Sequence, residues 1–337
     1  MSQTCSRLLF AVLLPLAAVR GDGTLPQRTA AVVLFPGAQV MGYAAPIDIL
    51  RYGGTSVFTV AEQPTVMTNG DLSVNAQYNF ENAPDPDILL VPGGSNLKAE
   101  LENPRLLRFL KDKAGKAQVV LSVSNGSFLL GKAGLLDDQT ATATFGLTDG
   151  LRRIAPLARV VDDVRYTDSG KYVTSAGLSA GIDAALHVLE KLDGRGAAQM
   201  AALAVEYNWD PEGSFVRSQL ADRLCAFRYA VTSAQSIRRE GDEEQWVNEW
   251  SVTDPSSPEV VFEAFQTAIR QHVTWMESTP QWTRIDGEDA PLRSQWRFRD
   301  ERDRSWRGVL EVTPNTVSRQ GVVVRLSLHL DPRRASI

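Results

Sequence analysis

The sequence is poor in the residues that bind metals or form disulfides. Its 337 residues include 2 cysteines, Cys5 and Cys225, and 3 histidines, His187, His272 and His329. These side chains are scattered and lack the short spacing that zinc ligands require, so we expect no metal site. If Cys5 were removed with an N-terminal signal, Cys225 would remain alone and no internal disulfide would form.

A large excess of one charge is also missing. The chain has 35 Lys and Arg against 40 Asp and Glu, a formal net charge of -5, and no long basic run. A general electrostatic attraction to nucleic acid or to anionic lipid is therefore not expected. The composition, with 43% hydrophobic and 22% charged residues, is that of a globular protein. Its length predicts about two domains, each with its own core.

The apolar run near the N-terminus is too short to cross a bilayer. It covers residues 8–19 (LLFAVLLPLAAV), follows Arg7 and precedes small residues around Gly21. This is the pattern of the hydrophobic region of a secretory signal. We therefore predict a signal peptide over residues 1–23 and a periplasmic or secreted protein that is not inserted in a membrane after signal removal. The alternative is an ordinary N-terminal helix on a cytoplasmic protein.

From residue 28 to residue 211 the pattern alternates between buried strands and helices. Short apolar runs, which are typical of parallel strands covered on both faces, occupy residues 30–35, 56–61, 88–91, 118–123 and 172–174. Between them lie helical stretches, among them residues 103–117 and 179–192. Strands that alternate with helices predict an α/β domain with a mainly parallel sheet and helices on both sides.

After residue 211 the alternation stops. We predict a helical connector over residues 212–240 and then a small α+β domain over residues 241–337 with antiparallel strands and a helix that starts near Pro258. Six of the seven tryptophans lie in this second part. They indicate either a small aromatic core or an aromatic-lined ligand groove. The charged residues 299–304 are expected to form a solvated hairpin turn.

Residues 120–132 (VLSVSNGSFLLGK) carry the strongest chemical motif. A strand here passes directly into a helix, and Ser124 stands at the turn. A side chain at such an elbow projects above the edge of the sheet, beside helix N-terminal amides that can stabilise a developing oxyanion. The glycines Gly93 and Gly94 would bring further backbone N–H groups near Ser124. No Lys-Ser or Lys-Thr pair follows them as in a phosphate loop, so we expect no cofactor.

Several segments together carry a family resemblance: residues 34–37 (LFPG), 46–48 (PID), 91–94 (VPGG), 133–137 (AGLLD) and 174–183 (TSAGLSAGID). With the elbow they resemble the ThiJ/PfpI family of the glutamine amidotransferase-like superfamily, most of all its isonitrile-hydratase-related branch. The resemblance covers about 180 residues and implies a flavodoxin-like fold and a homodimer.

The resemblance also shows where this sequence departs from the family pattern. Ser124 stands at the family's nucleophilic cysteine, Thr144 at a histidine of many relatives, and Gly42 at an acidic residue near the cysteine. A serine hydroxyl is almost never ionised near neutral pH without an adjacent base. We therefore expect a non-catalytic protein whose former cleft binds a small ligand or a partner.

The residues expected to form this binding cleft are Ser124, Asn125, Gly93, Gly94, Asp48 and Thr144. One alternative function is a hydrolase or hydratase that uses Ser124 as nucleophile, with a base from the second domain or from another subunit. A second alternative is a transcription regulator, because some relatives attach an AraC-type helix-turn-helix tail to this domain. The tail here has a strand-like pattern, which argues against DNA binding. His187 is expected to be a packed or surface residue of its helix and not the missing base.

Overall fold

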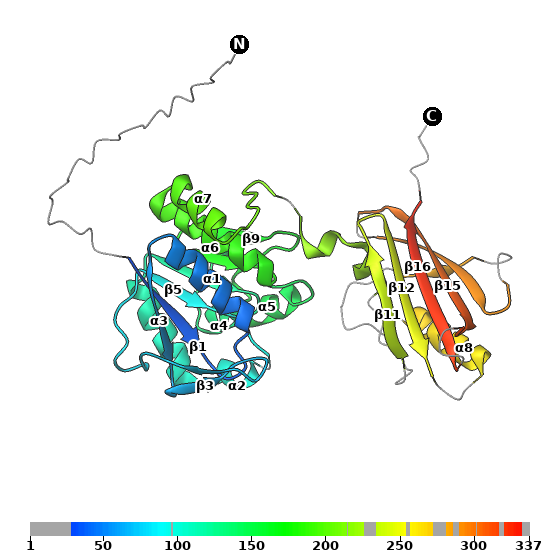
Figure 1. Ribbon diagram of the computed structural model, residues 1–337, viewed down its shortest axis with the longest axis horizontal. Helices are drawn as coiled ribbons and strands as arrows, with labels where there is room; N and C mark the ends of the chain where they lie inside the picture. The colour runs from blue at the N-terminus through cyan, green and yellow to red at the C-terminus, as the bar shows by residue number, and fades with distance from the viewer. Residues whose placement is uncertain are drawn as a thin grey trace, which may run out of the picture.

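The computed structural model describes residues 28–95, 97–213, 215–225, 234–253, 257–271, 281–285, 290–300, 302–316 and 320–331. The predicted signal peptide over residues 1–23 lies outside these ranges, and so do Cys5 and His272. None of the described helices is long and apolar enough to cross a membrane. Figure 1 shows two sheets, one built from residues before the connector and one from residues after it.

The first sheet has six strands in the order β2-β1-β5-β6-β10-β9. Its members are β1 (Thr29–Leu34), β2 (Ser56–Ala61), β5 (Ile88–Val91), β6 (Val119–Val123), β9 (Tyr166–Ser169) and β10 (Tyr172–Ser175). All neighbours are parallel except β9 and β10, which are antiparallel. The central strands are buried along their whole length, because helices cover both faces. The apolar runs in the sequence predicted this layer correctly.

The helices around this sheet are α1 (Val40–Tyr52), α2 (Lys98–Leu101), α3 (Pro104–Lys116), α4 (Gly126–Lys132), α5 (Thr148–Ile154), α6 (Leu178–Asp193) and α7 (Arg195–Ala204). The helices α1, α6 and α7 pack against one another, and α3, α4 and α5 form a second group. Four short strands add two small ladders that the sequence did not predict: β3 (Thr65–Met67) with β4 (Ser73–Asn75), and β7 (Thr140–Ala141) with β8 (Arg159–Val160).

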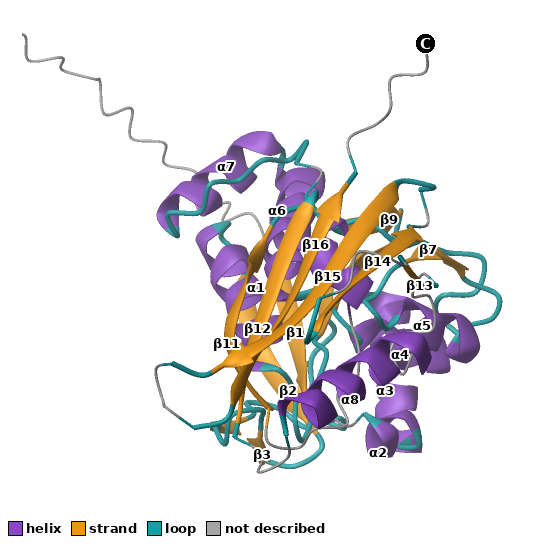
Figure 2. Cartoon of the chain, turned by 90° about the vertical axis from the view of Figure 1, so that its right-hand side faces the viewer, coloured by secondary structure: helices purple, strands orange, loops and turns teal. Residues whose placement is uncertain are grey.

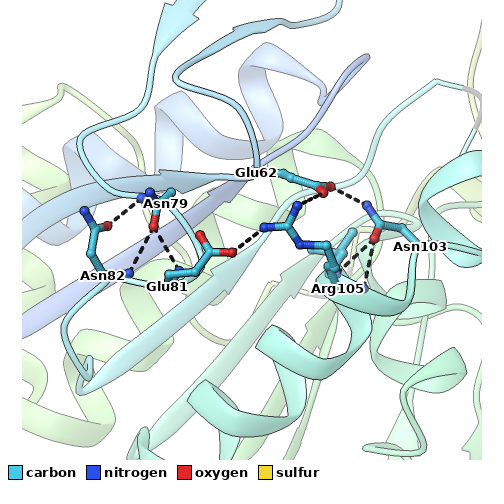
Figure 3. A network of polar contacts seen from close by, with 7 residues as sticks. Glu62, Asn79, Glu81, Asn82, Asn103 and Arg105 are labelled. Atoms are coloured by element: carbon cyan, nitrogen blue, oxygen red, sulfur yellow. Dashed lines mark hydrogen bonds and ion pairs between the residues drawn. The ribbon is translucent and has the colours of Figure 1, made fainter.

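A polar network ties the start of α3 to the end of β2 (Figure 3). Asn103 caps the helix by accepting a hydrogen bond of 3.0 Å from the backbone N–H of Arg105, and its amide donates to Glu62 at 2.8 Å. The Arg105 guanidinium pairs with Glu62 at 2.8 Å and also with Glu81. Asn79 stabilises the turn that it begins, because its Oδ1 accepts a hydrogen bond of 2.9 Å from the backbone N–H of Glu81. These contacts therefore hold the start of α3 against the segment that follows β2.

The second sheet is antiparallel, with the strand order β11-β12-β16-β15-β14-β13. Its strands are β11 (Ala234–Gly241), β12 (Gln245–Val252), β13 (Thr283–Arg284), β14 (Arg293–Arg299), β15 (Ser305–Pro314) and β16 (Val322–Leu330), and helix α8 (Pro258–Gln271) packs on β15 (Figure 2). The five tryptophans described here are at most 8% exposed. They form the core of this module and do not line a surface groove.

The connector predicted to be helical over residues 212–240 is different in the structure. It has two short 3-10 turns, η1 (Arg217–Gln219) and η2 (Ala221–Cys225), and strand β11 already starts within the predicted range. Nearly every residue of β11 is exposed because it is the edge strand, so no apolar run marks it in the sequence. Leu224 and Cys225 of η2 are buried in the core of the second sheet. The end of the connector therefore belongs to the second module.

The hairpin predicted over residues 299–304 lies between β14 and β15, as expected. However, it is not fully solvated, because the side chain of Asp300 is 0% exposed. Asp300 accepts hydrogen bonds from Trp306 Nε1 at 3.0 Å and from Arg304 Nε at 2.7 Å. The charged cluster thus contains a buried carboxylate that organises the turn.

Candidate functional site

Ser124 stands at a strained turn between β6 and α4. Its φ angle is 59°, in the left-handed region that residues other than glycine seldom adopt. The backbone N–H of Ser124 donates to the carbonyl oxygens of both Ser175 and Ala176, each at 3.0 Å. Ser175 is the last residue of the neighbouring strand β10 and Ala176 follows it, so the carboxyl ends of β6 and β10 hold the turn together. The elbow predicted from the sequence is present, and Ser124 is 5% exposed.

The glycine turn after β5 packs directly against this elbow. A Cβ atom at Gly93 would lie 2.3 Å from Asn125 Oδ1 and 3.0 Å from Ser124 Cβ. A Cβ atom at Gly126 would lie 2.3 Å from the carbonyl oxygen of Val91. Both distances are too short for any side chain, so the close approach of the two backbones requires glycine at these positions. Gly93 therefore lies beside Ser124, and the role of Gly93 and Gly94 in binding stays a prediction.

The Asn125 side chain is fully engaged by Gly94. Its Oδ1 accepts from the Gly94 N–H at 3.0 Å, and its Nδ2 donates to the Gly94 carbonyl oxygen at 3.0 Å. Asn125 was expected to bind a ligand, but its carboxamide instead holds the two turns together. The backbone N–H groups of Gly93 and Asn125 donate to no acceptor among the described residues.

No described residue forms a hydrogen bond with the Ser124 hydroxyl. Thr144 is half-buried, and its hydroxyl lies 3.3 Å from the point where Gly177 would carry a Cβ atom. Gly42 is buried in α1, where a Cβ atom would lie 3.6 Å from Pro92 Cβ and 3.8 Å from Gly93 N. Position 42 therefore faces the glycine turn and has room for a side chain, but glycine supplies no acid there.

Two further residues singled out in the sequence lie apart from these contacts. Asp48 is exposed on α1 and has no hydrogen bond or ion pair with the described residues, so its role in binding stays a prediction. His187 of α6 binds Asp168 at 2.8 Å and packs on the ring of Tyr166. Burial raises the pKa of Asp168, but hydrogen bonds from Lys191 and His187 outweigh it and hold that pKa below its ordinary value. His187 is thus a structural partner of Asp168.

A cavity of about 480 Å³, which the sequence did not predict, lies beside the elbow. The cavity is lined by loop residues such as Phe145 and Arg165, by the α6 N-cap Gly177, and by connector residues such as Arg217. Ser124 is not among its described lining residues, although Ala176, which accepts from the Ser124 N–H, is. The walls come from segments far apart in the chain, so no local pattern could have indicated this cavity.

Within the described residues, no group of three or more His, Cys, Asp or Glu side chains is placed to hold a metal ion. The chemical groups at the elbow are therefore a serine hydroxyl and backbone amides. Such a set can bind a small polar molecule.

Comparison with known proteins agrees with this geometry. Residues 28–191 match the model of the DJ-1/PfpI family. The isonitrile hydratase of Pseudomonas putida is 33% identical over 177 residues, which are 52% of this chain and 76% of the hydratase. The chain belongs to the DJ-1/PfpI family.

Other members show how far the similarity extends. A ThiJ/PfpI family protein from Pseudomonas syringae has a crystal structure that matches this DJ-1/PfpI chain with a TM-score of 0.52 and 26% identity, covering 60% of this chain and 85% of that one. The HTH-type transcriptional regulator CdhR of Pseudomonas aeruginosa is 27% identical over 223 residues, 63% of this chain and 64% of the regulator. These similarities cover 60% and 63% of this chain, so neither of them spans its whole length.

Proposed function

We propose that this protein is an exported, non-catalytic member of the DJ-1/PfpI family that binds a small ligand or a partner, with Ser124 in place of the family's nucleophilic cysteine. One observation carries the proposal. The Ser124 hydroxyl, at the elbow, has no hydrogen-bond partner among the described residues. A serine nucleophile needs a base within hydrogen-bond reach, and general-base help is worth about 10² to 10⁴ in rate.

The surroundings of Ser124 support the same conclusion. Thr144 and Gly42 stand at the positions where relatives of this family carry a histidine and an acidic residue. They bring neither an imidazole nor a carboxylate to the elbow. In addition, the Gly94 N–H is already bound to Asn125 Oδ1 at 3.0 Å, so it is not available to stabilise an oxyanion. A ligand that does bind at the elbow meets the N–H groups of Gly93 and Asn125, which favour a carbonyl or another hydrogen-bond acceptor.

The decisive experiment compares the wild type with Ser124→Ala. We expect neither protein to be labelled by a fluorophosphonate, nor to hydrolyse a p-nitrophenyl ester or hydrate an isonitrile above the buffer rate. Ser124→Cys alone should restore little activity, because a reactive thiolate also needs its neighbours. The triple variant Gly42→Asp, Ser124→Cys and Thr144→His should restore more activity than Ser124→Cys alone. Wild-type turnover that Ser124→Ala abolishes would instead support a Ser124-dependent hydrolase or hydratase.

The alternative of a transcription regulator finds no support in the second module. Its described residues form a six-stranded sheet with one helix, α8, and contain no pair of helices of the helix-turn-helix type. The similarity to the Pseudomonas aeruginosa regulator therefore supports a shared family domain.

Export remains part of the proposal and rests on the apolar run at residues 8–19. N-terminal sequencing of the protein from its native host should find a start between residues 18 and 24, and an intact Met1 or Ser2 in the cytosol would contradict export.

A further inference from the structure

We propose that the cavity between the family domain and the connector is a binding site for a small aromatic carboxylate. The inference goes beyond the proposed function, because it places a ligand in a cavity whose described lining does not include Ser124. The cavity has a volume of about 480 Å³, which is enough for a small ring compound, and its walls carry both aromatic and guanidinium groups.

A flat, cationic wall is provided by Arg217. Its guanidinium lies 5.2 Å from the centre of the Phe145 ring, in a cation–π contact. Two hydrogen bonds to Asp222, one of them 2.6 Å long, fix the plane of the guanidinium. The Arg217 side chain nevertheless keeps 45% exposure. A ligand ring can therefore stack on a guanidinium plane that is already oriented.

The carboxylate partner is Arg165. Its Nε donates to Asp183 at 2.6 Å, and its Nη1 donates to the backbone carbonyl oxygen of Phe215 at 3.2 Å. A carboxylate is a stronger acceptor for a guanidinium than a neutral carbonyl, so a ligand carboxylate can take over the Nη1 donor from Phe215. The Ser179 hydroxyl lies 3.3 Å from the same guanidinium. Ser179 belongs to the first turn of α6, whose positive dipole end also favours an anion.

The remaining charges argue for a single carboxylate and against a polyanion. Arg152 pairs with Asp149 and Asp162, and Arg223 pairs with Asp300. Arg165 and Arg217 are likewise paired, with Asp183 and Asp222. The arginines that line the cavity therefore leave no surplus of positive charge for a phosphate ester. What Arg165 offers to a single carboxylate is the Nη1 donor that a neutral carbonyl holds.

The probe for this site is benzoate, measured by isothermal titration calorimetry with the full-length protein. Benzamide is the neutral match of the same shape, and cyclohexanecarboxylate keeps the charge but lacks the flat ring. We expect saturable benzoate binding with one site per chain. Both analogues should bind at least about tenfold more weakly, since a charge-assisted hydrogen bond or a cation–π contact is worth about that factor.

Variants locate the site. Arg165→Gln and Arg217→Gln should each weaken benzoate binding about tenfold or more. Because Arg165→Gln also removes the cationic partner of Asp183, Phe145→Leu serves as a second variant that changes the stacking wall and no ion pair. Arg159→Gln makes the same charge change at an exposed arginine of β8 and should bind as the wild type does. Ser124→Ala should also leave binding unchanged, because Ser124 is not among the described residues that line the cavity.

Three outcomes would overturn the inference. They are the absence of saturable benzoate binding, equal affinity for benzamide, and loss of benzoate binding in Ser124→Ala, which would move the ligand to the elbow. None of them depends on the turnover assay. Wild-type turnover with unchanged benzoate binding would refute the non-catalytic function alone, and failure of benzoate to bind a catalytically silent protein would refute this site alone.

Discussion

The side chain of Asn125 and the backbone of Gly94 form two reciprocal hydrogen bonds, each 3.0 Å long. They join the residue after the elbow to the turn after β5, and so connect the carboxyl ends of two adjacent parallel strands. The carboxamide satisfies both backbone groups of Gly94 with one side chain. The Asn125 side chain therefore fixes the elbow against the glycine turn.

Replacing Asn125 should loosen this contact. In Asn125→Ala the Gly94 N–H loses its acceptor, so we expect faster hydrogen exchange at Gly94 by NMR and a loss of about 1–3 kcal/mol in the free energy of unfolding. Asn125→Asp keeps an acceptor for the N–H but has no donor for the carbonyl, so its loss should be intermediate. Unchanged exchange at Gly94 in Asn125→Ala would show that another group holds the turn.

The two glycines Gly93 and Gly115 should respond to alanine in opposite directions. A Cβ atom at Gly93 would stand 2.3 Å from Asn125 Oδ1, whereas a Cβ atom at Gly115 would meet no atom within 4 Å. Gly93→Ala should therefore lower the free energy of unfolding by about 1–3 kcal/mol or more. Gly115→Ala, on an exposed position of α3, should raise it by about 0.5–1 kcal/mol. Urea denaturation of both variants tests this pair.

Ser124 offers a test of backbone strain and of its hydroxyl together. Because its φ is 59°, Ser124→Gly should relieve strain and be at least as stable as the wild type, although glycine usually costs about 0.5–1 kcal/mol. Ser124→Ala should change the free energy of unfolding by less than about 0.5 kcal/mol, since the hydroxyl has no partner among the described residues. A loss of more than about 1 kcal/mol in Ser124→Ala would show that the hydroxyl has a hydrogen-bond partner and would contradict this prediction.

The sequence was most informative where burial is complete. Strand β5 (Ile88–Val91) is buried on both faces, so its run of apolar residues marked it at its observed bounds. Strand β11 was missed because an exposed edge strand needs no apolar side chains, and its charged residues fit a helix equally well. The transition at Ser124 was predicted because a strand that enters a helix without a linker leaves only a sharp turn.

The contacts that shape the site depend on side-chain directions that no local pattern encodes. The sequence placed Asn125 beside Gly94 but did not show that its carboxamide would bind both backbone groups of Gly94. Likewise, the pairing of Arg165 with Asp183 and with the Phe215 carbonyl joins segments 18 and 50 residues apart. Such long-range contacts follow from the packing of the fold, and so the cavity was missing from the sequence-based prediction.

The two modules should fold independently when the chain is divided before the connector. Among the described residues, the family core includes none beyond Trp209, and η2 belongs to the second core. We therefore expect fragment 28–213 to unfold cooperatively on its own. Fragment 215–337 should also fold, whereas fragment 234–337 should be less stable because it lacks the buried residues Leu224 and Cys225. Equal stability of the last two fragments, measured by thermal melting, would contradict the assignment of η2 to the second core.

The buried carboxylate of Asp300 should make the second module sensitive to acid. Burial raises the pKa of Asp300, but hydrogen bonds from Trp306 and from Arg304 outweigh it, so the folded-state pKa lies below the ordinary value of 3.8. A depressed pKa stabilises the fold at pH values above 3.8, and this contribution is lost as the pH falls through the folded-state pKa. The unfolding free energy of the second module should therefore decrease steeply below pH 3.8.

The variant Asp300→Asn tests whether the acid sensitivity of the second module comes from Asp300 or from other carboxylates. The variant should lose about 3–5 kcal/mol at neutral pH, because Arg223 and Arg304 keep their charges without the buried partner. It should also show a smaller further loss in acid. Asp303→Asn is the matched control, since the Asp303 side chain is 83% exposed and its ion pair with Arg299 is worth little. Tryptophan fluorescence during urea unfolding follows this module, which holds six of the seven tryptophans. An acid dependence in Asp300→Asn as steep as in the wild type would assign the acid sensitivity to other carboxylates.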